Sequence, residues 1–197
     1  FIANNYEIPI SIDTRSSRVA MAFEKNNINF INDVSSGCHD SDMLDVVSKL
    51  GCSYIMTHMP REHKEGSIKV YDDILSEIKT YFTDRIQKCV EAGISKEKII
   101  IDPGIGFGKS GENNINLLKN IKWLKTIHSN VCIGSSNKRY SSQLFKHIQT
   151  KEDLRIANLA TFATSTFYGV TYLRVHDVEL TKDTVLVINK AVELEQS

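Results

Sequence analysis

Residues 99–109 read Ile-Ile-Ile-Asp-Pro-Gly-Ile-Gly-Phe-Gly-Lys, an apolar run that ends on a carboxylate and a glycine-rich loop. Three β-branched residues in a row predict a strand buried on both faces, because a half-exposed strand alternates apolar and polar side chains. Pro103 and Gly104 then end the strand. Since the carboxyl ends of parallel strands carry the chemistry of α/β folds, the stretch predicts a parallel sheet with Asp102 at its functional edge.

Short apolar runs of this kind alternate along the chain with longer segments of helical periodicity, which is the pattern of repeated βα units. The predicted strands cover residues 9–13, 30–34, 53–57, 98–102, 131–135 and 172–175. The predicted helices cover residues 16–26, 42–50, 68–92, 112–128, 151–168 and 182–194.

Six units of about 33 residues favour an α/β chain with the (β/α)8 TIM barrel fold, which typically has about 250 residues. We therefore expect a single barrel domain over residues 1–197 that holds βα units 3 to 8, with the first two units absent from this chain. An open doubly wound sheet remains the alternative, because strand patterns do not show closure.

The predicted helix 68–92 has the clearest periodicity. An apolar residue recurs at every fourth position, and Gly93 stands where a helix is commonly ended by a left-handed glycine. The stripe consists of Val70, Ile74, Ile78, Phe82, Ile86 and Val90.

The composition excludes several classes of function. A formal net charge of +0 and a pI near 7.2 argue against a nucleic-acid or acidic-membrane partner, because such partners attract clustered Lys and Arg. The four cysteines form no C-x-x-C pair, so they indicate a reducing compartment rather than a zinc site or a disulfide framework. No membrane span or leader is recognisable, and we expect a cytoplasmic protein.

All six predicted strands end on polar side chains that can bind or react. These are Asp13, Asn32, His58, Asp102, the group Ser135, Ser136 and Lys138, and the pair Arg174 and His176. Any strand must end on something polar, but six ends that supply acid, amide, hydroxyl, base and guanidinium groups together indicate one site.

Two glycine patterns near this edge resemble phosphate-binding loops. Residues 106–111 fit G-x-G-x-x-G, but the next predicted strand ends in Ser135 and Ser136 rather than in the acid that binds a ribose. Residues 108–110 resemble the end of a P-loop, yet Pro103 stands where its first glycine belongs. Neither a nicotinamide site nor a nucleoside-triphosphate site is predicted.

Six short motifs occur in the order and spacing of the dihydropteroate synthase family, which the chain resembles over nearly its whole length. They are Ser11-Ile-Asp-Thr, Ile31-Asn-Asp, Met56-Thr-His-Met, Asp102-Pro-Gly-Ile-Gly-Phe-Gly-Lys, Gly134-Ser-Ser-Asn-Lys-Arg and Arg174-Val-His-Asp. The resemblance implies a transferase of folate biosynthesis that condenses 6-hydroxymethyl-7,8-dihydropterin pyrophosphate with p-aminobenzoate and releases pyrophosphate. It also implies a homodimer and a target of sulfonamide drugs.

The resemblance assigns roles to individual residues. Pterin contacts are implied for Asp13, Asn32, Met56, Asp102, Phe107, Gly134, Lys138 and Arg174. Pyrophosphate contacts are implied for Arg174 and His176, and p-aminobenzoate contacts for Ser136 and Lys138. Catalytic roles are implied for Asp13, Lys138 and Arg174.

The chemistry of a pterin agrees with these roles. Its 2-amino group and ring N–H are parallel donors that Asp102 can accept bidentately, and the amide of Asn32 matches the mixed edge of the ring. The carboxylate of Asp13 can stabilise positive charge that develops on the exocyclic methylene as pyrophosphate leaves. The guanidinium of Arg174 can stack on the ring and direct its donors at phosphate.

The chain departs from the family at two points. Asn137 replaces an arginine of the family's S-R-K motif, a cation that Arg139 could supply instead. The N-V-T-P-D-S-F loop, which supplies the family's magnesium-binding asparagine, has no match here. Mg2+ is therefore expected as a cofactor without a ligand from this chain. Two explanations stay open: the missing segments precede Phe1 in the natural protein, behind a fused pterin pyrophosphokinase, or the product is degenerate.

Two other functions stay open. One is a related pterin-binding methyltransferase that acts on methyltetrahydrofolate, although Lys138, Arg139, Arg174 and His176 favour a pyrophosphate-releasing synthase. The other is a pterin-binding protein without turnover.

Overall fold

The computed structural model describes residues 2–60, 67–136 and 138–195, and its strands run parallel to one another in the order of the sequence. They are β1 (Ser11–Asp13), β2 (Phe30–Asp33), β3 (Ser53–Thr57), β4 (Ile99–Asp102), β5 (Cys132–Ile133) and β6 (Tyr172–Leu173). The first four strands form one sheet, β5 pairs with β6, and a bridge between Ile101 and Val131 joins the two groups.

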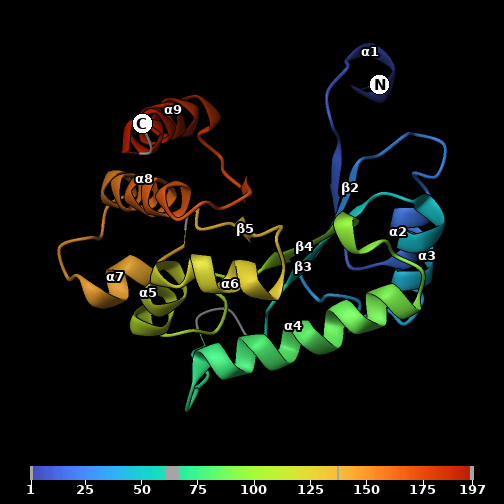
Figure 1. The fold of residues 1–197 in the computed structure, drawn as a ribbon, viewed down its shortest axis with the longest axis horizontal. Helices are drawn as coiled ribbons and strands as arrows, with labels where there is room; N and C mark the ends of the chain where they lie inside the picture. The colour runs from blue at the N-terminus through green and yellow to red at the C-terminus, as the bar shows by residue number, and fades with distance from the viewer. Residues whose placement is uncertain (1, 61–66, 137, 196–197) are drawn as a thin grey trace.

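Helices follow each strand and lie outside the sheet, so the predicted βα units are present (Figure 1). They are α1 (Ile2–Asn5), α2 (Ser17–Met21), α3 (Met43–Leu50), α4 (Ile74–Glu91), α5 (Gly111–Lys119), α6 (Ile121–Ile127), α7 (Tyr140–Leu144), α8 (Lys151–Phe167) and α9 (Val178–Glu195), with a 3-10 turn at Lys96–Lys98. In Figure 1, α4 runs along one side of the sheet, while α8 and α9 pack together beside β6.

Alternate residues of each strand face opposite sides of the sheet. Tyr54 and Met56 pack with the helices in the main core, whereas Ile55, Ile100 and Cys132 form a small separate cluster. Two apolar clusters on opposite faces are what a barrel requires, because its strands are covered by helices outside and by one another inside. Because both faces of the strands are buried, their sequences are uninterrupted apolar runs.

Helix α4 buries a stripe that differs from the predicted one. Ile74, Ile78 and Phe82 are buried as expected, but the stripe then continues through Arg85 and Cys89, while Val90 is 48% exposed. Four residues turn an α-helix by about 400°, so a strict four-residue repeat drifts around the helix by about 40° per step. Val70 precedes the helix and is 87% exposed, so the predicted start at residue 68 was wrong.

The predicted glycine end of α4 is confirmed. Gly93 has φ +90°, its N–H donates to the Val90 carbonyl at 2.9 Å, and the N–H of Ile94 donates to the Cys89 carbonyl at 2.9 Å. These two bonds make a Schellman motif, which satisfies carbonyls that the helix end leaves open.

Other element boundaries also differ from the predicted ones. The predicted helix 112–128 is interrupted at Asn120, whose side-chain amide donates to the Asn116 carbonyl at 2.7 Å and gives two shorter helices. Helix α9 starts four residues early because Asp177 accepts the Leu180 N–H at 3.3 Å and caps the helix. Strands β5 and β6 are shorter than predicted, at two residues each.

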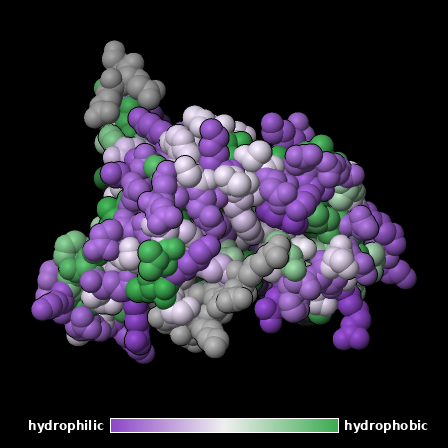
Figure 2. Space-filling view, turned by 90° about the horizontal axis from the view of Figure 1, so that it is seen from below, coloured by the Kyte–Doolittle hydropathy of each residue, from purple (hydrophilic) through white to green (hydrophobic). Residues whose placement is uncertain are grey.

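The surface offers no broad apolar face in the view of Figure 2, where hydrophobic residues form small separate patches in a mostly hydrophilic surface. None of the helices in the described residues is long and apolar enough to cross a membrane. The four cysteines are thiols, of which Cys38 is exposed and the other three are buried.

Candidate active site

A cavity of about 410 Å³ lies at the carboxyl ends of the strands, where the sequence predicts the site. It is lined by Asp13, Asn32, Val34, Phe107, Gly134, Ser136, Lys138, Arg174, Val175 and His176. Eight of these are predicted site residues, and they come from segments that follow or end β1, β2, β4, β5 and β6. The sheet curvature therefore brings distant strand ends to one place.

Arg174 lies at the floor of this cavity and connects two predicted pterin ligands. Its Nη2 donates to Asp102 Oδ2 at 2.8 Å, and its Nη1 donates to Asn32 Oδ1 at 3.2 Å. Asp102 is fully buried, while the Arg174 side chain is 35% exposed. Asp102 does not line the cavity itself, because the guanidinium of Arg174 covers its carboxylate.

Gly134 leaves room for this arrangement. A Cβ atom at this position would stand 2.5 Å from Arg174 Nη2, well inside contact distance. The backbone N–H of Arg174 also donates to the Ile133 carbonyl at 2.9 Å, so β5 fixes both the backbone and the side chain of Arg174.

The buried side chain of Lys109 holds the glycine loop after β4 through hydrogen bonds. Its Nζ donates to the carbonyls of His58, Gly104 and Phe107 at 3.0, 2.9 and 3.1 Å, and the residue is 1% exposed. Burial lowers the pKa of Lys109 to about 7, although the nearby Asp102 carboxylate opposes this effect. The sequence indicates Lys109 only as the last residue of a motif, because a buried lysine that binds backbone carbonyls has no local signature.

Phe107 and Lys138 form one wall of the cavity. Lys138 Nζ lies 3.7 Å from the centroid of the Phe107 ring, a cation–π contact. Gly106 (φ +80°) permits it, because a Cβ there would be 2.9 Å from Lys138 Cβ. The prediction that both side chains border the site agrees with this geometry.

Met56 does not lie where it was predicted. Its side chain is fully buried in the main core, with its sulfur 3.4 Å from Cys89 Sγ. The register pairs Met56 with Ile101 and Thr57 with Asp102, and paired residues of parallel strands point to the same side. Thr57 therefore faces the inner side with Asp102, and within the described residues its buried Oγ1 has no hydrogen-bond partner.

Asp33 was missed as a structural residue of the site. Its two oxygens accept from the N–H and Oγ of Ser35, from the N–H of Gly37 and from the hydroxyl of Tyr54, all at 2.6–2.8 Å. This buried carboxylate shapes the loop that follows Asn32. The succession Asp-Val-Ser-Ser-Gly is a turn signal that could have revealed it.

His58 directly follows β3 but does not line the cavity. It is 2% exposed, and its Nε2 lies 3.8 Å from Glu77 Oε1. Burial, with the charges of Lys109 and Lys69, lowers the pKa of His58 to about 2, so the ring is neutral. It takes no part in the cavity.

The described residues contain no group of three or more His, Cys, Asp or Glu side chains arranged to hold a metal ion. These residues alone therefore do not form a magnesium site. Asn137 lies outside the described residues.

Comparison with known proteins identifies the relatives of this arrangement. The family described as pterin binding enzyme matches residues 1–176. The dihydropteroate synthase of Escherichia coli (strain K12) is 30% identical over 199 residues, which cover the whole chain and 69% of the relative. This chain belongs to the dihydropteroate synthase family. Membership makes it an α/β barrel transferase, as the strand pattern and the motifs predicted.

Solved dihydropteroate synthase structures agree with the fold. The Xanthomonas albilineans enzyme with 4-aminobenzoic acid has a TM-score of 0.87 and 32% identity, over 98% of this chain and 70% of that one. The Coxiella burnetii enzyme in complex with pteroic acid has a TM-score of 0.86 and 27% identity, over 96% of this chain and 71% of that one.

Proposed function

We propose that the protein carrying this chain condenses 6-hydroxymethyl-7,8-dihydropterin pyrophosphate with p-aminobenzoate and releases pyrophosphate. The observation that supports it best is the buried Asp102 carboxylate, held by the guanidinium of Arg174 beneath a cavity of about 410 Å³. A buried carboxylate needs two well-aligned donors, and a pterin edge supplies them in the same geometry as a guanidinium.

In this proposal the pterin takes the place of Arg174 on Asp102. The 2-amino group and ring N–H of the pterin donate to the carboxylate, while Asn32 and the inner-facing Thr57 meet other polar atoms of the ring. Arg174 then moves toward the face of the ring and the pyrophosphate. The exchange keeps Asp102 paired throughout, which avoids the cost of a bare buried charge.

The reacting bond lies between the exocyclic methylene carbon and the pyrophosphate oxygen. The amine nitrogen of p-aminobenzoate forms the new C–N bond, the C–O bond breaks with its electron pair going to pyrophosphate, and the nitrogen loses a proton. Asp13, exposed at the end of β1, stabilises positive charge on the methylene carbon. Lys138, Arg174 and His176 stabilise the departing pyrophosphate, and Ser136 with Lys138 contacts the carboxylate of p-aminobenzoate.

The test combines turnover with binding. The full-length protein, with magnesium and both substrates, is expected to form dihydropteroate, measured by chromatography. The variant Asp102→Asn is expected to lose pterin binding in calorimetry, whereas Asp84→Asn, an exposed carboxylate of α4, is expected to bind normally. Pterin binding without turnover would instead support a non-catalytic pterin-binding protein, and normal binding by Asp102→Asn would contradict the proposed anchor.

We also propose that the protein forms a homodimer. Large apolar side chains stand exposed on the last two helices, namely Ile156, Phe167, Val178, Leu186, Val187 and Leu194. Exposed apolar residues concentrated on neighbouring helices favour a protein interface. Light scattering of the full-length protein should give twice the chain mass. Magnesium dependence, a fused kinase, the single-domain boundary and a cytoplasmic location stay predictions from the sequence.

A further inference from the structure

A cavity of about 390 Å³, here called the α4 cavity, lies outside the substrate cavity. Its walls come from α4, from the segment before α4, and from the segments that follow β2 and β3. Among the described residues, the two cavities share no lining side chain. Small-molecule sites have volumes of about 300–1,000 Å³, so the α4 cavity is large enough for an organic ligand.

Two polar side chains of the α4 cavity are buried with one atom each left without a hydrogen-bond partner. Arg85 is 7% exposed, and its Nε has no partner among the described residues. His58 is 2% exposed, and the same holds for its Nδ1. Buried polar atoms in folded proteins almost always have a partner. Because both side chains line one cavity, a ligand that supplies the missing polar atoms would explain both.

The positive charge of Arg85 is not balanced by the acids of the α4 cavity. A guanidinium stays charged in proteins, and a buried charge without a counter-ion is unfavourable. Glu77 and Asp84 line the cavity, but Glu77 Oε1 lies 3.3 Å from Lys69 Nζ and Asp84 Oδ2 lies 2.9 Å from Lys88 Nζ. Both acids are therefore neutralised by other cations, and the cavity favours an anion beside Arg85.

A third carboxylate, that of Asp33, lies near the loop that Arg85 borders. A Cβ atom at Gly37 would be 3.1 Å from Arg85 Nη2, and the N–H of Gly37 donates to Asp33 Oδ2 at 2.7 Å. The other hydrogen bonds that Asp33 accepts come from Ser35 and Tyr54. Its charge lowers the cost of burying Arg85, but among the described residues the two form no ion pair.

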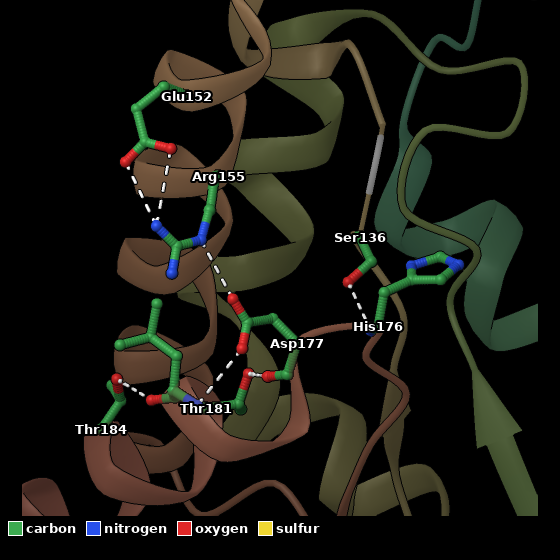
Figure 3. Close-up of polar contacts among 8 residues, drawn as sticks. Ser136, Glu152, Arg155, His176, Asp177, Thr181 and Thr184 are labelled. Carbon is green, nitrogen blue, oxygen red and sulfur yellow. Dashed lines mark hydrogen bonds and ion pairs between the residues drawn. The ribbon is translucent and has the colours of Figure 1, made fainter.

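The larger cavity beside α8, of about 470 Å³, differs in this respect. Its buried wall also carries a guanidinium, but Arg155 Nε donates to Asp177 Oδ2 at 3.0 Å, and Arg155 Nη1 donates to Glu152 Oε1 at 3.2 Å (Figure 3). That cation is already paired, whereas Arg85 is not paired within the described part of the chain.

The wall beside Arg85 is apolar and aromatic. Met59, Pro60 and the ring of Tyr81 line the cavity and are half-buried. The rings of Tyr81 and His58 meet edge to face, with their centroids 4.9 Å apart, and this contact holds both rings in place. Apolar surface beside a cation favours an anion with an apolar body. The carboxylates of the same lining repel a multiply charged anion such as phosphate.

We propose that the α4 cavity binds a monocarboxylate with a single flat apolar ring, of which benzoate is the simplest member. The two carboxylate oxygens accept from Nε–H and a neighbouring Nη–H of Arg85, a parallel pair of donors that matches a carboxylate. The ring lies against Tyr81 and Met59. His58, in the tautomer with its proton on Nδ1, supplies a further donor. Binding at this site requires no turnover and so does not depend on the proposed function.

The exposed thiol of Cys38 lines the α4 cavity and serves as a built-in reporter. The alkylation rate of Cys38 by iodoacetamide is measured by mass spectrometry on the full-length protein, with benzoate, uncharged benzamide or inorganic phosphate. We expect benzoate at up to about 10 mM to slow alkylation by about threefold or more, because one-ring ligands bind with Kd values of about 1 mM. Benzamide and phosphate should have little effect, and the alkylation rate of free glutathione should not change. Cys38 does not line the substrate cavity, so benzoate bound there would not give this result.

Variants of α4 test the role of the guanidinium. Arg85→Met should abolish the protection by benzoate, and Arg85→Lys should weaken it, because an ammonium lacks the parallel donors. Lys79→Ala removes an exposed cation of α4 that does not line the α4 cavity, and it should leave the protection unchanged. Circular dichroism checks that each variant is folded. If Arg85→Met does not fold, the comparison of benzoate with benzamide in the wild-type protein still decides.

Four results would overturn the proposal. They are no protection by benzoate, equal protection by benzamide, stronger protection by phosphate, and protection that persists in folded Arg85→Met. Stronger protection by phosphate would assign the cavity to a small oxyanion instead. None of these results bears on the turnover of pterin substrates, so failure here leaves the proposed function standing.

Discussion

At the scale of single residues, Arg174 donates hydrogen bonds to two buried polar side chains, the carboxylate of Asp102 and the amide oxygen of Asn32. This arrangement keeps a ligand site ready without leaving a bare charge in it. Removing one partner of such a pair is more costly than its net contribution suggests, because the other charge stays buried alone.

Gly134→Ala tests this pair without touching a charged group. The new Cβ would displace the guanidinium, so we expect the free energy of unfolding to fall by about 1–3 kcal/mol, as measured by urea denaturation. In the Arg174→Leu background the same substitution should cost much less. An equal loss in both backgrounds would show that the effect does not pass through Arg174.

Lys109→Met tests the lysine that holds the glycine loop. Methionine fills similar space but removes the Lys109 donor from three carbonyls, of which, in the described residues, only that of Gly104 keeps another donor, the N–H of Phe107 at 3.1 Å. We therefore expect the free energy of unfolding to fall by about 2–4 kcal/mol in urea denaturation. The exposed Lys119, changed to Met in α5, serves as the control and should lower it by less than about 0.5 kcal/mol.

At the scale of elements, sequence patterns located the strands and helices better than they located their ends. The helix that follows β3 was recognised from its apolar repeat, but the buried stripe shifts to Arg85 and Cys89 because a four-residue repeat is not the period of the helix. The sequence did not predict the break at Asn120, because asparagine is tolerated within helices. The break accompanies a hydrogen bond from the Asn120 side chain to the Asn116 carbonyl, and such side-chain bonds compete with the helical backbone pattern.

Gly93→Ala tests the end of α4. Alanine is strained at φ +90°, and its Cβ would lie 2.9 Å from Ser48 Oγ, so we expect a loss of about 1–2 kcal/mol in thermal unfolding. Adding Ser48→Ala removes the steric part and should restore some of the loss. No recovery would mean that backbone strain alone accounts for the effect.

At the scale of the whole molecule, His58 makes global stability depend on pH. Burial lowers its pKa from 6.5 to about 2, so below pH 6.5 the unfolded chain binds a proton that the folded chain does not. The free energy of unfolding should therefore fall as the pH drops from 6.5 toward 2, by up to about 1.4 kcal/mol per pH unit from this residue.

The measurement is urea denaturation at several pH values between 7 and 4. The wild-type slope should exceed that of His58→Gln, while the exposed His147, changed to Gln, should leave the slope unaltered. A wild-type slope equal to that of His58→Gln would show that His58 is not the group responsible.

The sequence by itself determined the repeated βα units, the resemblance to the family and most of the cavity lining, because these depend on local patterns and on the order of short motifs. An apolar run that ends in Asp102, or in Arg174 and His176, predicts a strand and its functional end without knowledge of any neighbour. Tertiary structure alone decided which of those ends touch. The hydrogen bond from Arg174 to Asn32 joins residues 142 positions apart, and Lys109 binds carbonyls of two loops. Thr57 rather than Met56 faces the inside of the sheet, because strand register decides which side each residue faces. Such contacts depend on how the sheet curves and on which strands pair, and neither property is written in any short stretch of the chain.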